Sequence, residues 1–379
     1  MKKYAIRTTL LGLGMTLATT AAMAHPGHGQ EASAPSPELL LALQDANASG
    51  TAASSGKTSG QGDLRFKVIY STADLPAATE PGILSAHGGF AVDRRDGKGE
   101  IYWALPKVGI LRIGNDLKTV DVLPTDRKMK PTNMHNATIW YGKKDQAYLT
   151  FPGNDSARIY TTDLDGTLLN ILESPTAETK FDENRVSKYF ADGKKFIPTD
   201  VEVVNNKFYI TTGYSPLDYV LTANVKAKKD VTSEWASMAF GGKGSRPGQF
   251  GTGHGITIKP DGKTIAVADR PNAEIEEFDL KGNYLNTLNL PEGAFPCDID
   301  YQSGYTIVGC LHGKDREAGA PIYIVKDGEV VSTIMIKSEL GLADFQHVHN
   351  AVMIERNGKF YVITQAWNPG GFAILEQVK

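Results

Sequence analysis

From Leu64 onward, the chain consists of short runs in which apolar and polar residues alternate, separated by tight-turn sequences. Alternation with a period of two is typical of β-strands, because successive side chains of a strand point to opposite faces. Residues 259–263 (KPDGK) and 279–283 (DLKGN) are typical hairpin turns. No long segment has the 3.6-residue period of an amphipathic helix. The pattern therefore predicts an all-β fold.

Six segments in this region share one layout, in which a short polar start leads into alternating apolar residues and a tight turn. Aligned on this layout, the segments contribute one residue each to a common position: His87, His135, Asp200, His254, Asp298 and His349. These positions are 48, 65, 54, 44 and 51 residues apart, which suits four-stranded propeller blades with some insertions. We therefore predict a six-bladed β-propeller over residues 64–379. A β-sandwich is the alternative fold, but it does not explain six segments that align.

The last repeat has room for only three strands between His349 and the C-terminus. Residues 64–71 (LRFKVIYS) alternate in the same way and can supply the missing outer strand. We expect this N-terminal strand to close the last blade, because pairing the two ends of the chain leaves no open sheet edge there.

The N-terminus differs in composition from the rest of the chain. Basic residues precede an apolar run over residues 8–21, and residues 22–24 (AMA) form a small-residue cleavage site. Residues 1–24 therefore have the features of a cleaved secretory signal, which predicts a periplasmic or secreted protein without a membrane span after cleavage. Residues 25–63 are rich in Ala, Ser, Gly, Pro and Thr, and we expect a flexible low-complexity arm there.

Cleavage after residue 24 would leave His25 and His28 at the start of the mature chain. A free α-amine and two imidazoles can capture Cu²⁺ or Zn²⁺. The alternative is a merely hydrophilic start to the arm, because nothing in the sequence fixes the geometry of these groups.

Cys297 and Cys310 are the two cysteines, and they flank a predicted hairpin with its turn at residues 302–304 (QSG). A turn centred between residues 303 and 304 would place the two cysteines opposite each other. An exported protein reaches a compartment in which such a pair can oxidise, so a cross-strand disulfide is expected if the geometry permits it. The alternative is two buried reduced thiols.

The aligned position carries four imidazoles and two carboxylates. In a propeller the innermost strand of each blade lines the central channel, so equivalent residues form a ring. His135, His254 and His349 come from alternate blades, and a ring of six would place them with near-three-fold symmetry. Three neutral imidazoles with an open position suit Zn²⁺, although histidine ligation alone also suits other transition metals. The alternative is a polar, water-filled channel mouth.

The residues that precede and follow His254 resemble the NHL repeat. The run over residues 240–250 (FGGKGSRPGQF) resembles the NHL linker, and residues 253–279 resemble an NHL blade. More narrowly, the chain resembles the catalytic domain of peptidyl-α-hydroxyglycine α-amidating lyase, a six-bladed propeller that cleaves α-hydroxyglycine-extended peptides to a peptide amide and glyoxylate. This resemblance implies a central zinc on three histidines, which match His135, His254 and His349.

The same resemblance implies a catalytic tyrosine and arginine. The family's tyrosine follows a Pro-Thr-Asp blade start and a Gly-Tyr pair, which places it at Tyr214, and its arginine follows Val-Ala-Asp, which places it at Arg270. A phenolic base and a guanidinium that binds a carboxylate suit such a lyase. Taken alone, a tyrosine such as Tyr214 is more often a packing or rim aromatic, and an arginine such as Arg270 a surface ion-pair partner.

The chain also departs from the family. The first blade (residues 102–106, YWALP) has no counterpart of the family's arginine, and His347 stands where the family has a methionine. Asn350 replaces an aspartate that binds calcium in the family, so the resemblance does not carry a structural Ca²⁺ over to this chain. His87 adds an imidazole to the ring.

Three functions are consistent with these observations. The first is a metal-dependent lyase, with a small-molecule or peptide substrate. The second is a non-catalytic periplasmic propeller that binds or delivers metal, and the third is an NHL interaction scaffold. The formal net charge of −3 gives no basic excess, so we expect no nucleic-acid partner.

Overall fold

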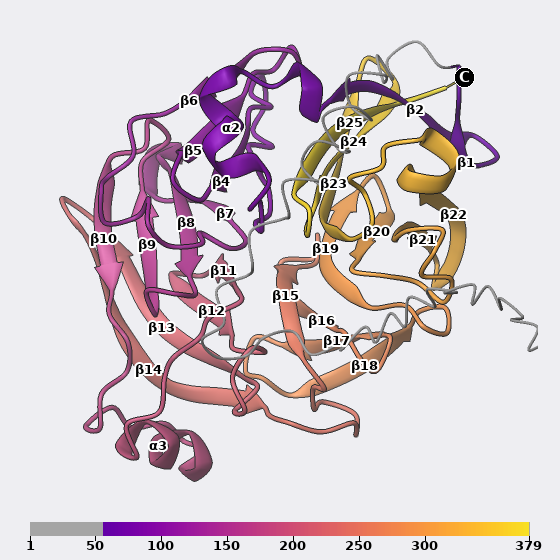
Figure 1. Cartoon of the computed structure of the whole chain (residues 1–379). Coiled ribbons are helices and arrows are strands. Elements are labelled where there is room, and N and C mark those ends of the chain that lie inside the picture. Colours follow the sequence, from indigo (N-terminus) through magenta and orange to yellow (C-terminus); the bar gives the residue numbers. More distant parts are fainter. Residues whose placement is uncertain (1–55, 379) are drawn as a thin grey trace, which may run out of the picture. The chain divides into compact units, whose positions relative to one another are not determined.

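The structure, a computed structural model, describes residues 56–378, and this part of the chain forms six antiparallel sheets arranged as a β-propeller (Figure 1). Five of the sheets contain four consecutive strands each. The sixth has the strand order β1-β2-β25-β24-β23, so both ends of the described chain belong to it. The predicted six-bladed propeller is confirmed.

In blades 1 to 5 the strands follow one another along the chain, from the innermost to the outermost, whereas blade 6 takes its outer strands from the start of the described chain. Blade 1 consists of β3 (Ala91–Val92), β4 (Ile101–Leu105), β5 (Gly109–Ile113) and β6 (Val120–Val122). Blade 2 consists of β7 (Thr138–Tyr141), β8 (Ala147–Gly153), β9 (Arg158–Thr162) and β10 (Leu168–Leu172). Blade 3 consists of β11 (Asp200–Val204), β12 (Lys207–Thr211), β13 (Tyr219–Ala227) and β14 (Val231–Gly241). Blade 4 consists of β15 (Gly253–Ile258), β16 (Thr264–Asp269), β17 (Glu274–Asp279) and β18 (Tyr284–Asn289). Blade 5 consists of β19 (Pro296–Gln302), β20 (Tyr305–Cys310), β21 (Pro321–Lys326) and β22 (Glu329–Met335). Blade 6 consists of β23 (Val348–Arg356), β24 (Lys359–Ala366), β25 (Gly371–Gln377), β2 (Leu64–Ser71) and β1 (Ser59–Gln61).

Helices are short and lie in the connections. The α-helices are α2 (Glu80–Ile83) and α3 (Asn184–Ala191), and further single turns lie at Thr72–Asp74, Ala77–Thr79, Lys143–Asp145 and Ile336–Leu340. Helix α3 buries Val186 and Phe190 against blades 2 and 3, and its insertion explains why the repeat spacing is longest there. Within residues 56–378, no helix is both long and apolar enough to cross a membrane.

Two-residue turns join several of the neighbouring strands. Asp327–Gly328 and Asn357–Gly358 have positive φ at both residues, as do Asn205–Asn206 and Ser303–Gly304. Positive φ at both central positions defines the type I′ turn, whose twist matches that of a β-hairpin. Asn, Asp and Gly adopt this conformation at low cost, so the sequence encodes these hairpins locally.

The apolar core is divided among the interfaces between blades. Six buried clusters occur, and each one joins two neighbouring blades, including blades 6 and 1. At that last interface the Trp103 ring of β4 stacks on Phe372 of β25, with the centroids 4.7 Å apart and the planes at 6°. Apolar burial between blades therefore continues around the whole ring, which leaves the channel-facing residues free to be polar.

The N-terminal strand closes the last blade as predicted. Strand β2 spans Leu64–Ser71 and pairs antiparallel with β25. The preceding strand β1 lies within the segment that the sequence assigned to the arm, and the Ser59 hydroxyl accepts a hydrogen bond from the Met335 backbone N–H at 2.7 Å. The ordered blade therefore begins before residue 64. The predicted signal at residues 1–24, the arm up to residue 55, and His25 and His28 lie outside the described residues.

The expected disulfide is absent, and both cysteines are free and buried. The turn is centred between Ser303 and Gly304 as expected, but β19 has a bulge between Pro296 and Asp298. The bulge shifts the register by one residue, so that Cys310 lies opposite Pro296 instead of Cys297.

Candidate metal centre

His135, His254 and His349 come together beside the inner strands of blades 2, 4 and 6, with His254 in β15, His349 in β23 and His135 just before β7. All three side chains are fully buried. The ring centroids are 4.7 Å apart for His135 and His254, 4.5 Å for His135 and His349, and 5.0 Å for His254 and His349. The alternate-blade arrangement that the sequence predicts thus brings these three imidazoles into one cluster.

A backbone carbonyl of the following blade fixes each of the three rings. Nδ1 of His135 donates to the Thr199 oxygen, Nδ1 of His254 to the Cys297 oxygen at 2.6 Å, and Nδ1 of His349 to the Gly88 oxygen at 2.9 Å. A carbonyl oxygen can only accept, so the proton of each neutral ring is on Nδ1. Each Nε2 therefore carries a lone pair, and such hydrogen bonds to the second nitrogen orient metal-binding histidines in proteins.

His349 Nε2 in particular has the properties of a metal ligand. His349 Nε2 is buried and has no hydrogen-bond partner among the described residues, which is costly for a polar atom unless a ligand satisfies it. Burial lowers the pKa of His349 to about 3, and burial followed by the charge of Arg270 lowers the pKa of His254 well below its usual value. Both rings are therefore neutral at neutral pH, as metal binding requires. The residues present fit a transition metal held by imidazoles.

His87 also joins the cluster, but from the segment before the inner strand β3 of blade 1. Its ring centroid lies 4.6 Å from that of His135 and 4.4 Å from that of His349. One imidazole nitrogen from each of these three residues lies within 4.8 Å of the others. The blade 1 residue equivalent to the three fixed histidines is Gly88, whose carbonyl binds His349. His87 therefore lies one residue before the position in its blade that corresponds to His135, His254 and His349.

Asp200 and Asp298 lie one residue after the ring position in their blades. The prediction that they belong to the histidine ring is therefore wrong. The residues at the ring position in blades 3 and 5 are Thr199 and Cys297, whose carbonyls bind His135 and His254. Asp200 accepts from the Asn136 amide at 3.1 Å, and Asp298 accepts from the Asn350 amide. Both carboxylates thus lie one residue further along their strands than the histidines.

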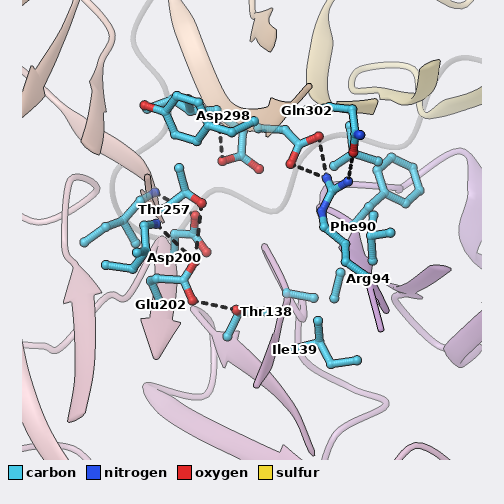
Figure 2. A pocket seen from close by; sticks show the side chains of 18 of the residues that line it. Phe90, Arg94, Thr138, Ile139, Asp200, Glu202, Thr257, Asp298 and Gln302 are labelled. Carbon is cyan, nitrogen blue, oxygen red and sulfur yellow. Dashed lines mark hydrogen bonds and ion pairs between the residues drawn. The ribbon is translucent and has the colours of Figure 1, made fainter. Parts of the chain in front are cut away.

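The two aspartates instead line a cavity of about 440 Å³ that all six inner strands surround (Figure 2). Glu202 and Asp300 also line it, and Arg94 Nη2 donates to Asp300 Oδ1 at 2.6 Å. Burial raises the pKa of Asp200 and of Asp298 well above the usual range, and the charge of Asp200 raises that of Asp298 further. We call this cavity the carboxylate cavity and the cluster around His135, His254 and His349 the histidine cluster.

Tyr214 and Arg270 both lie at the histidine cluster. The Tyr214 hydroxyl is 2.7 Å from His254 Nε2, 3.2 Å from His135 Nε2 and 3.3 Å from His87 Nε2. Arg270 Nη1 donates to the Tyr214 hydroxyl at 3.3 Å, and Arg270 Nη2 donates to His254 Nε2 at 2.7 Å. Burial raises the pKa of Tyr214, while the charge of Arg270 opposes that rise.

Arg270 is a buried cation without a carboxylate partner in the described part of the chain. Its side chain is 1% exposed, and its Nε atom has no hydrogen-bond partner there. Its third contact is the Cys297 thiol, 3.1 Å from Nη2. A buried guanidinium costs several kcal/mol unless it is paired, so this group is suited to an anionic ligand. The reading of Arg270 as a surface ion-pair partner is wrong.

Some residues of the site carry no signal in the sequence. Asn133 Nδ2 lies 2.9 Å from His87 Nδ1, and the Trp367 ring packs on His87 with the centroids 5.3 Å apart. The three carbonyls that orient the histidines belong to the backbone, so no residue type marks them. His347 lies beside Trp367 at 5.8 Å, and its Nδ1 bonds to the Leu311 carbonyl, outside the histidine cluster.

No family model and no curated protein sequence matches the chain. Solved structures with a similar fold include a streptogramin B lyase (11% identity, 78% of this chain and 94% of that chain, TM-score 0.46) and the virginiamycin B lyase of Staphylococcus aureus (13%, 78% and 97%, 0.45). A chain of the Mitotic Checkpoint Complex covers 84% of this chain and 95% of its own length at 11% identity and a TM-score of 0.50. At these identities the likeness concerns the propeller fold alone.

Proposed function

We propose that the chain is an exported, metal-dependent lyase of the amidating-lyase type, or a relative that acts on another small hydroxylated substrate. One observation carries the proposal. Three imidazoles from alternate blades, each with its Nδ1 bonded to a backbone carbonyl, cluster beside a tyrosine hydroxyl and a buried guanidinium.

His135, His254 and His349 would hold the metal. Zn²⁺ suits a set of three neutral imidazoles with an open position, and other transition metals also accept nitrogen ligands. When bound, the ion would act as a Lewis acid that polarises a substrate oxygen. This donor set is the same as that implied by the family resemblance.

Tyr214 and Arg270 have complementary roles in this proposal. Arg270 would bind the substrate carboxylate, which supplies the counter-charge that its buried guanidinium lacks. In its phenolate form, which the charge of Arg270 favours, Tyr214 would take the proton of the substrate hydroxyl as that oxygen forms a carbonyl, while the C–N bond breaks and its electrons pass to nitrogen. A proton returned to that nitrogen gives the amide, and the other product is a glyoxylate-type acid. The reaction is redox-neutral, so it needs no oxidant or reductant.

A non-catalytic metal-binding or metal-delivery propeller is the second candidate. It is favoured by His87, which places a fourth imidazole against the three fixed rings. The predicted His25 and His28 arm would serve the same function. A delivery protein would bind metal without turning over a substrate, and this difference separates the two candidates.

The test uses the mature chain purified without a histidine tag. We expect about one transition-metal ion per chain by mass spectrometry of the metal, and release of glyoxylate from an N-acyl-α-hydroxyglycine. Removal of the metal with a chelator should abolish the release, and Zn²⁺ should restore it. A metal-loaded chain that leaves hydroxyglycine and other hydroxy-acid substrates unchanged would support metal delivery instead. A chain that binds no metal would refute both.

A further inference from the structure

The four clustered imidazoles differ in the hydrogen bond made by the nitrogen that faces away from the centre. In His135, His254 and His349 that nitrogen donates to a carbonyl oxygen, which leaves Nε2 as an acceptor or ligand. In His87 it lies 2.9 Å from the amide nitrogen of Asn133. An amide nitrogen only donates, so His87 Nδ1 must accept.

The tautomer of His87 is therefore the reverse of the other three. With Nδ1 as an acceptor, the neutral ring has its proton on Nε2, and that N–H points to the Tyr214 hydroxyl at 3.3 Å. A nitrogen that carries a proton has no lone pair for a metal. Proximity alone would place His87 in a metal-binding set with His135 and His349, but its hydrogen bonds exclude it from that set.

The surroundings of His87 hold its ring in this orientation. The ring packs between the edges of His135 and His349 and against Trp367. The backbone beside the ring also packs closely on blade 2, because a Cβ at Gly88 would lie 2.7 Å from the His135 carbonyl oxygen. The His87 side chain is half-buried, whereas the three fixed histidines are fully buried.

We propose that His87 is a substrate-binding residue instead of a fourth metal ligand: Asn133 keeps it as a neutral hydrogen-bond donor that, together with Tyr214, binds the oxygen of a small hydroxy or carbonyl acid. This inference rests on the proposed three-histidine metal centre. It adds a donor from blade 1, the blade in which the chain lacks the arginine of the family it resembles.

The test compares His87→Ala with His349→Ala in the mature full chain, using Co²⁺ as the metal and glyoxylate as the probe. We expect His87→Ala to keep Co²⁺ affinity within about three-fold of the unmodified chain, whereas His349→Ala loses about a hundred-fold or more. Glyoxylate, followed through the visible Co²⁺ spectrum, should bind His87→Ala about three- to ten-fold more weakly.

Asn133→Asp supplies a second variant that reverses the hydrogen bond. A carboxylate accepts from Nδ1, so His87 would turn a lone pair toward the centre and the Co²⁺ spectrum should change to that of a centre with one more nitrogen ligand. Asn133→Leu is the matched control without a hydrogen bond.

The results separate this inference from the proposed function. Loss of Co²⁺ by His87→Ala to the extent seen with His349→Ala would make His87 a ligand and overturn the inference, while the metal centre would stand. Unchanged glyoxylate binding in His87→Ala would also overturn it. Full Co²⁺ binding by His349→Ala would refute the metal centre itself.

Discussion

The histidine cluster and the carboxylate cavity are built from the same six inner strands, yet their polar atoms are satisfied in different ways. Every carboxylate oxygen of Asp200, Glu202, Asp298 and Asp300 accepts at least one hydrogen bond. At the histidine cluster, His349 Nε2 and Arg270 Nε are buried without a partner among residues 56–378.

The donors at the carboxylate cavity reveal its structural function. Asp200 Oδ2 accepts from the Ile256 backbone N–H at 2.8 Å, and Asp300 Oδ2 accepts from the Met353 backbone N–H at 2.8 Å. Each bond runs from a blade to the inner strand of the next blade. An inner strand has no further strand on its channel side, so its N–H groups that face the channel need such acceptors. The carboxylates therefore join neighbouring blades.

The largest difference between the two regions should appear in metal affinity. Replacing His254 by Ala removes one of three ligands, and we expect Zn²⁺ affinity to fall by about a hundred-fold or more without unfolding, because the ring lies outside the apolar cores between blades. Asp298→Asn should bind Zn²⁺ as the unmodified chain does. Competition with a chromophoric chelator measures both.

His312→Ala is the matched control for this prediction, because His312 is buried but stacks on Phe295 away from the cluster. Equal losses in His312→Ala and His254→Ala would mean that the effect comes from general destabilisation. A loss of metal in Asp298→Asn would extend the metal site into the carboxylate cavity and break the distinction between the two regions.

Catalysis should show the next largest difference. Tyr214→Phe removes only a hydroxyl, and the rate of glyoxylate release should fall by about a hundred-fold or more if that hydroxyl is the general base. Metal content and the melting temperature should not change. Tyr301→Phe is the control, because Tyr301 is a tyrosine that lines the carboxylate cavity. If both variants retain the unmodified rate, Tyr214 is not the base.

The sequence predicts the blades better than the positions within them. Alternation and repeat spacing give six blades, and the closing strand is found at residues 64–71 because its pattern matches the other strands. These features depend on many residues at once, so local irregularities do not obscure them.

Single positions at the blade starts are harder to predict, because β-bulges occur there. The register shifts between Gly253 and Ile256, between Pro296 and Asp298, and between Val348 and Asn350. A bulge adds a residue on one strand and turns side chains to new directions. In blades 5 and 6 the bulges lie at matching positions, so Cys297 corresponds to His349, and the sequence alignment was one residue off in blade 5. The bulge in blade 5 also separates Cys297 from Cys310.

Protonation provides the smallest but most direct test of the carboxylate cavity. Burial raises the pKa of Asp298 well above its usual value of 3.8, so the folded state retains a proton that the unfolded state releases. The folded state then binds more protons than the unfolded state above about pH 4, and stability falls as pH rises toward the folded pKa. The slope is at most about 1.4 kcal/mol per pH unit for one such carboxyl.

Asp298→Asn removes the titrating group, so above about pH 4 the free energy of unfolding should depend less on pH than in the unmodified chain. Urea denaturation of the metal-free protein at several pH values measures the slope. Asp116→Asn is the control, because turn hydrogen bonds lower the pKa of this exposed carboxyl to about 2, and its contribution to stability is lost only as pH falls from about 4 to 2. A slope that Asp298→Asn leaves unchanged would mean that the buried carboxyl is ionised in the folded state. The charge would then be stabilised by the N–H donors of the neighbouring blade, and the carboxylate cavity would hold a net negative charge at neutral pH.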